Sequence, residues 1–158
     1  MTDFHELYRR YAADVYRFAR FLSGDAAEAE EITAETFARA LTGRTPLISA
    51  TVKGYLLTIA RNLHVESARR RKRIAGLPPE LPDARPSPDR LTEQRTELEA
   101  LQRHLQNFSE VDRAALLLRA DGIGYEDIAL ALGISVASAK VKVHRVRLKL
   151  VEWRAARS

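Results

Sequence analysis

The sequence predicts an all-α protein in which a flexible proline-rich linker joins two small helical domains. Apolar residues recur every three or four positions through most of the 158 residues, and no useful stretch alternates as a strand would. Five of the six prolines fall between Pro78 and Pro88, where neither a helix nor a central strand can form. We therefore expect domains at residues 1–75 and 93–158 and a linker at 76–92. An ordered surface loop inside one domain is the alternative, although loops this long are uncommon in compact domains.

The periodic segments predict seven helices in order along the chain. They are expected near residues 4–22, 26–41, 52–73, 91–105, 109–119, 125–132 and 135–154. Ser23-Gly24-Asp25 separates the first two, because glycine ends a helix readily and aspartate caps the next one. Glutamates crowd the early turns of the second helix, where negative charge suits the helix dipole.

The composition limits the classes of function that the chain can have. The net charge is +5 with a pI near 9.8, and the basic residues are clustered, as in proteins that bind nucleic acid. Cysteine is absent and the four histidines are scattered without ligand spacing, so we expect no metal, no cofactor and no enzymatic site. We expect no leader peptide, because the first residues lack a basic segment followed by an apolar run, and no run approaches the roughly 20 apolar residues of a membrane span. The expected location is the cytoplasm.

The strongest local signal is a helix-turn-helix at residues 125–150, YEDIALALGISVASAKVKVHRVRLKL. Gly133 suits the left-handed conformation that ends a helix, and Ser135 is placed to cap the next one. In that second helix small or polar residues come first and basic ones follow, so its start would face base edges and its later cations would hold phosphates. The candidate DNA contacts are Ser135, Ala137, Ser138, Lys140, Lys142, His144 and Arg145. A helical hairpin with a solvated basic face is the alternative.

Two further clusters lie in the first domain. The run RRRKR (Arg69, Arg70, Arg71, Lys72 and Arg73) ends the third helix and predicts a phosphate-binding patch, or only solvated cations that complement the helix dipole. Earlier in this helix, Arg61, Asn62 and His64 supply hydrogen-bond donors, and Tyr55 could stack on an unpaired base or belong to the core. The acidic second helix would repel DNA, so it is either only solvated or bound by a basic protein.

Together these segments resemble the extracytoplasmic-function (ECF) sigma factors of bacteria, the smallest group of the sigma-70 family. DAAEAEEITAETFARA, residues 25–40, is similar to the region 2 helix that binds the clamp of core RNA polymerase. GYLLTIARNLHVESARRRKR, residues 54–73, is similar to the helix that reads and helps to melt the −10 element. Residues 109–150 resemble region 4, which recognises the −35 element. The stretches IARN, YEDIA and LGIS are specific when they occur in this order.

The resemblance implies a sigma factor that directs core polymerase to specific promoters. Its implied partners are core RNA polymerase, duplex and melted promoter DNA and an anti-sigma factor, with no small-molecule substrate. The implied polymerase-binding residues are Glu28, Glu31, Glu35 and Phe37, and the implied −10 contacts are Tyr55, Arg61, Asn62, His64 and Arg69 to Arg73. A helix-turn-helix regulator that is not a sigma factor is the alternative. It would explain residues 125–150 but not the acidic helix.

Overall fold

The computed structural model describes residues 4–43, 51–76 and 97–157, and the regular structure in these ranges is entirely helical. The helices are α1 (Phe4–Ser23), α2 (Ala26–Thr42), α3 (Val52–Ala75), α4 (Glu97–Leu105), α5 (Glu110–Ala120), α6 (Tyr125–Leu132) and α7 (Val136–Arg157). The all-α prediction is confirmed. Of the expected linker, residues 77–92 lie outside the described residues, as does the predicted start of the fourth helix at Leu91. Among the described helices, none has the length and apolar character needed to cross a bilayer.

Capping side chains fix where the helices begin. Asp25 accepts a hydrogen bond from the backbone N–H of Glu28 at 2.9 Å and so caps α2, which starts two residues after the break at Gly24. Thr51 and Ser109 cap α3 and α5 in the same way. Each cap satisfies one of the backbone donors that a helix start leaves without a partner inside the helix.

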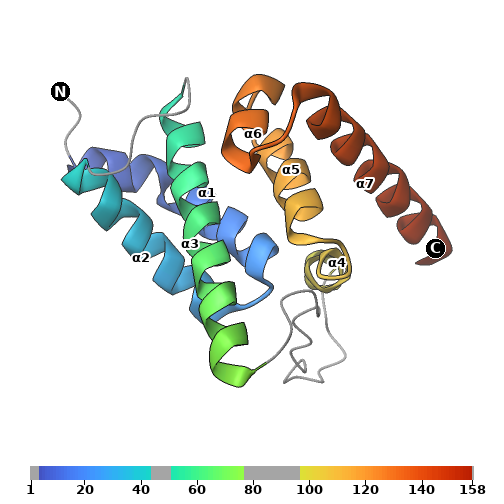
Figure 1. The fold of residues 1–158 in the computed structure, drawn as a ribbon, viewed down its shortest axis with the longest axis horizontal. Coiled ribbons are helices and arrows are strands. Elements are labelled where there is room, and N and C mark those ends of the chain that lie inside the picture. Colours follow the sequence, from blue (N-terminus) through green and yellow to red (C-terminus); the bar gives the residue numbers. More distant parts are fainter. Residues whose placement is uncertain (1–3, 44–50, 77–96, 158) are drawn as a thin grey trace.

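The first three helices pack into one half of the molecule (Figure 1). Their shared core contains fully buried residues from each helix, among them Phe18 and Leu22 of α1, Phe37 of α2 and Leu56 of α3. Burial of each such side chain stabilises the fold by roughly 1.5–3 kcal/mol. This packing holds α2 and α3 side by side, with Glu31 and Glu35 of α2 and Arg69 and Arg70 of α3 exposed at the surface.

Helices α5, α6 and α7 pack together in the other half, around Leu118, Ile128, Val143 and Val146. The short α4 contacts the far end of α7, where the His104 ring stacks on Trp153 with centroids 4.6 Å apart and planes 10° from parallel. The contacts with α4, α5 and α6 therefore determine which side of α7 is buried and which side faces solvent.

The two halves are in contact with each other. Helix α1 packs against α4 and α5, α3 also reaches α5, and the buried apolar residues of both halves form one continuous cluster. In Figure 1, α5 and α4 lie between the α1–α3 half and α7. Side chains of the first half that face α5 are therefore covered in this arrangement.

Candidate nucleic-acid interface

The turn between α6 and α7 has the geometry that the sequence predicts for a helix-turn-helix. Gly133 has φ 67°, a left-handed conformation that suits glycine, and Ile134 N–H donates to the carbonyl of Ala129 at 3.0 Å. Ser135 Oγ then accepts from the N–H of Ser138 at 3.0 Å and caps α7. The predicted roles of Gly133 and Ser135 in the turn are confirmed.

Helix α7 buries one side and exposes the other. Ala139, Val143 and Val146 are fully buried and define the inner side. Of the candidate DNA contacts, Ser135, Ala137, Lys140, His144 and Arg145 are exposed, whereas Ser138 and Lys142 are partly buried. The exposed side also carries Val141 and Leu148, each 52% exposed, which are not among the residues that the sequence predicts to contact DNA.

Two of the basic residues on α7 have neighbours that affect what they can bind. Lys142 Nζ lies 3.3 Å from the carboxylate of Asp112 in α5, so part of its charge is neutralised within the protein. Lys140 lies over the ring of Tyr125 at 5.7 Å, while Arg119 lies closer to the same ring, at 4.4 Å. Lys140 remains exposed. It is the better placed of the two lysines to meet a phosphate.

Some of the candidate −10 residues on α3 are exposed, whereas others contact side chains of α2. Arg69, Arg70 and Arg73 are exposed, and Asn62, Tyr55 and Lys72 are partly exposed. His64 is only 5% exposed, and its Nδ1 lies 2.7 Å from the carboxylate of Glu28. Arg71 also contacts Glu28, at 2.9 Å. In this arrangement the side chains of His64 and Arg71 therefore tie α3 to α2.

Glu28 differs from the other acidic residues that were expected on a polymerase-binding surface. It is 7% exposed and faces α3, whereas Glu31 and Glu35 are exposed on α2. Phe37 is 1% exposed and lies within the core behind them. Only Glu31 and Glu35 of this set can touch a partner in the present arrangement.

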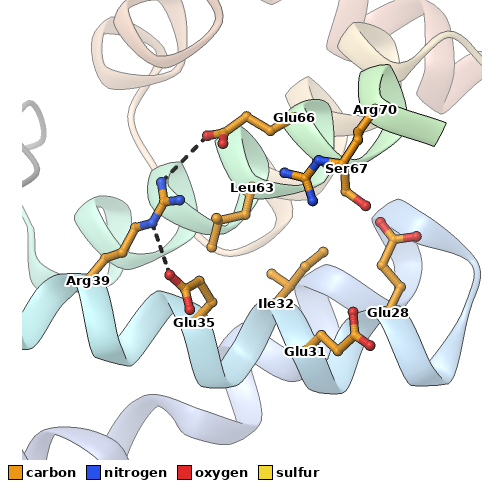
Figure 2. A pocket seen from close by; sticks show the side chains of 9 residues that line it. All are labelled: Glu28, Glu31, Ile32, Glu35, Arg39, Leu63, Glu66, Ser67 and Arg70. Atoms are coloured by element: carbon orange, nitrogen blue, oxygen red, sulfur yellow. Dashed lines mark hydrogen bonds and ion pairs between the residues drawn. The ribbon is translucent and has the colours of Figure 1, made fainter. Parts of the chain in front are cut away.

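A polar groove separates α2 from α3 (Figure 2). Arg39 spans it, donating to Glu35 on its own helix at 3.3 Å and lying 3.5 Å from Glu66 of α3. Figure 2 also shows Arg70 over the groove on the α3 side, opposite acidic side chains of α2. The acidic helix and the basic helix end are thus adjacent surfaces, and part of the basic charge faces α2.

Among the candidate DNA-binding residues, Arg61 is covered where the two halves meet. Its Nε and Nη2 donate to the two carboxylate oxygens of Glu110 in α5, at 2.8 and 2.6 Å. The Arg61 and Glu110 side chains are 14% and 24% exposed. A bidentate pair of this kind uses the planar edge with which a guanidinium would otherwise bind a phosphate or a base.

Two side chains of the second half also hydrogen-bond to the end of α1. Arg113 Nε donates to the carbonyl of Leu22 at 3.0 Å, and Gln106 Nε2 donates to that of Phe21, also at 3.0 Å. Carbonyls in the last turn of a helix have no partner within the helix, so these bonds complete it. Gly24 has φ 73°, a left-handed conformation that favours glycine, and a Cβ at this position would lie 2.8 Å from the Gln106 side chain, which would then have to move.

Asp121, at the end of α5, contributes a third polar contact between the halves. Its carboxylate lies 3.4 Å from Arg17 and 3.8 Å from Lys53. Burial raises the pKa of Asp121 above its ordinary value, and the nearby Lys53 and Arg17 oppose that shift only in part. These two contacts are also longer than those of the Arg61–Glu110 pair, which measure 2.6 and 2.8 Å.

Two protein-family models match the chain. Residues 7–74 match sigma-70 region 2, and residues 98–150 match sigma-70 region 4. The ECF RNA polymerase sigma factor SigE of Mycolicibacterium smegmatis is 33% identical over 164 residues, covering 100% of this chain. This chain spans 64% of the length of that relative. The ECF RNA polymerase sigma factor EcfG of Rhodopseudomonas palustris is 33% identical over 141 residues, covering 84% of this chain and 75% of its own length.

A solved structure has the same fold. The sigma factor RpoE of Bartonella quintana, crystallised in complex with the anti-sigma factor NepR, matches with a TM-score of 0.74 at 26% sequence identity. The match covers 96% of each chain, so it includes both helical halves. With both family regions present and ECF sigma factors as relatives, the chain belongs to the sigma-70 family, in its ECF group.

Proposed function

We propose that this protein is a transcription initiation factor that joins core RNA polymerase and directs it to specific promoters. The observation that carries the proposal is the presence of three separate surfaces in one chain. They are the exposed acidic side of α2, the basic end of α3 and the exposed side of α7 in the helix-turn-helix. A protein that only binds DNA needs the last of these alone.

The acidic side of α2 is the proposed polymerase-binding surface. Glu31 and Glu35 supply its exposed charge, and carboxylates there would pair with a basic partner and not with DNA. Phe37 supports this side from the core, and Glu28 holds α2 to α3 through His64. In the proposal Glu28, His64 and Phe37 therefore act by shaping the surface and do not touch the polymerase or DNA.

DNA recognition is proposed to use α7 and α3 together. Exposed residues at the start of α7 would read the −35 duplex, and Lys140 and Arg145 would hold its phosphates. Asn62, Arg69 and Arg73 of α3 would engage the −10 strand and help to melt it. Arg61 can join them only after it exchanges the Glu110 carboxylate for the nucleic acid. The proposal therefore requires the two halves to separate, as domains at residues 1–75 and 93–158 joined by residues 76–92.

An anti-sigma factor is a further proposed partner of this chain. The Bartonella relative binds an anti-sigma factor, and we propose that a protein of that kind also holds this chain. The polymerase supplies the chemistry, so we expect no catalytic activity from the chain itself. It would act in the cytoplasm, where polymerase and chromosome meet.

Reconstitution tests the proposal against the alternative of a regulator that is not a sigma factor. The chain is added to core polymerase free of sigma factors, and transcripts from fragmented genomic DNA are mapped by their 5′ ends. Discrete start sites that need the chain are expected. If the chain binds DNA but no start site ever depends on it, it is a regulator of the alternative kind.

A charge-reversed variant tests the polymerase-binding surface. Glu31→Arg with Glu35→Arg is expected to weaken binding to core polymerase at least tenfold, because two exposed carboxylates become repulsive cations. Glu126→Arg with Glu152→Arg changes the net charge equally at exposed positions of α6 and α7 and serves as the control. Equal affinities for the two double variants would remove α2 from the polymerase-binding surface.

A further inference from the structure

Val141 lies near the start of α7, on its exposed side. It is two residues after Ala139 and two before Val143, both fully buried, and two residues turn an α-helix by about 200°. The Val141 side chain therefore points almost directly away from the core, and it is 52% exposed. The exposed part of its apolar surface takes no part in the packing of α7 against α5 and α6.

The neighbours of Val141 favour one kind of occupant. Ala137 and Arg145 lie four residues before and after it on the same side of the helix, and Lys140 is exposed beside it. No aspartate or glutamate occurs between Val136 and Val151. A short apolar patch within a surface that carries only positive charge suits duplex DNA, because cations can reach the phosphates while the patch enters the groove.

Within a major groove, a valine side chain has one feature to recognise. It neither donates nor accepts hydrogen bonds, so it cannot distinguish bases by their polar edges. The 5-methyl group of thymine is the apolar group exposed on the floor of that groove. The small Ala137, one turn earlier, leaves room for the helix to approach closely.

We propose that Val141 determines sequence specificity by packing against the 5-methyl group of a thymine in the −35 duplex. The inference rests on the proposed function and adds a base-reading residue to it. Leu148 is equally exposed but lies seven residues further along α7, about 10 Å away, beyond the start of the helix that reaches base edges. It provides a matched control on the same helix.

The test uses the full chain assembled on core polymerase. Bound duplexes are selected from a random library to define the preferred −35 site. Each thymine of that site is then replaced in turn by deoxyuridine, which lacks only the 5-methyl group. One replacement is expected to lower the affinity of the wild-type complex about three- to fivefold, the size associated with one buried methyl group. Val141→Ala should show the lower affinity on the thymine duplex and no further loss with deoxyuridine, whereas Leu148→Ala should respond like the wild type.

Each outcome decides a different point. If no sequence is selected at all, the proposed function fails and not only this inference. If a site is selected but every deoxyuridine replacement is neutral, or Val141→Ala remains as sensitive as the wild type, Val141 does not read a thymine methyl group. If Val141→Ala and Leu148→Ala instead weaken polymerase binding to the same extent, the exposed apolar side of α7 binds protein and the inference is wrong. Circular dichroism of each variant checks that α7 is intact.

Discussion

Arg61 of α3 and Glu110 of α5 form a two-point ion pair across the contact between the helical halves, with nitrogen–oxygen distances of 2.6 and 2.8 Å. The pair places a candidate DNA-binding guanidinium against a carboxylate of the other half. Arg113 and Gln106 add hydrogen bonds from the second half to the last turn of α1. The halves therefore have a specific polar contact in addition to their shared apolar core.

Removing the charge of Glu110 should destabilise this contact. Glu110→Gln is expected to lower the free energy of unfolding by about 1–3 kcal/mol, because Arg61 would lose a charge-assisted partner at a mostly buried position. Urea unfolding followed by circular dichroism measures the change. Glu126→Gln is the control, since Glu126 also lies in the first turn of its helix but is exposed. Equal losses of unfolding free energy in both variants would mean that the effect comes from removing a negative charge near a helix N-terminus and not from the Arg61–Glu110 pair.

Glu28 should matter for stability far more than its exposed neighbour Glu31. Glu28→Ala is expected to cost about 3 kcal/mol, because it leaves the buried His64 and the cationic Arg71 without their shared carboxylate. Glu31→Ala should change stability by less than about 0.5 kcal/mol, as is usual for an exposed position. Thermal unfolding compares the two. Similar midpoints for both variants would contradict a structural role for Glu28.

The His104–Trp153 stack predicts a sensitivity to acid. Burial lowers the pKa of His104 below its ordinary value of 6.5, so the unfolded chain binds a proton more readily than the folded one. This group therefore contributes stability that is complete above pH 6.5 and declines as the pH falls through the folded-state pKa. His104→Phe keeps a ring over Trp153 but does not titrate, so its unfolding free energy should fall less than that of the wild type between pH 7 and pH 5.

Fluorescence of Trp153, the one tryptophan of the chain, follows this unfolding directly. Urea titrations at pH 5, 6 and 7 show how steeply the free energy of unfolding changes with pH in the wild type and in His104→Phe. His144, which is exposed, provides the control through His144→Phe. A wild-type slope that persists in His104→Phe would assign the acid sensitivity to another group.

Lys142 should bind DNA more strongly once its partner in α5 is neutral. Asp112→Asn removes the carboxylate that lies 3.3 Å from Lys142, so one more cation becomes available to a phosphate. The dependence of log affinity on log salt concentration should steepen by up to about 0.9, the value for one additional neutralised phosphate. Fluorescence anisotropy with a labelled duplex of arbitrary sequence measures it. Asp14→Asn makes the same charge change in α1 and serves as the control. If it steepens the salt dependence equally, the effect comes from the net charge of the protein and not from Lys142.

The sequence predicted what depends on neighbouring residues. The break at Gly24, the cap at Asp25 and the turn at Gly133 and Ser135 all depend on residues within four positions of one another, and all are present. The Arg61–Glu110 pair joins residues 49 positions apart, for which no local pattern exists. Glu28 was expected on the polymerase-binding surface because its segment resembles the region 2 helix, and only the packing of α2 on α3 shows it buried. Val141 was overlooked because it lies off the apolar repeat of α7, although that same displacement places it on the exposed side.

Promoter opening tests the proposed sigma activity most directly. A promoter fragment found by start-site mapping is incubated with core polymerase and the chain, and unpaired thymines are detected with permanganate. We predict reactive thymines around the −10 element only when both proteins are present, with a weaker signal for Asn62→Ala combined with Arg69→Ala. An identical pattern with core polymerase alone, or a duplex that stays closed with both proteins on every mapped promoter, would contradict the assignment.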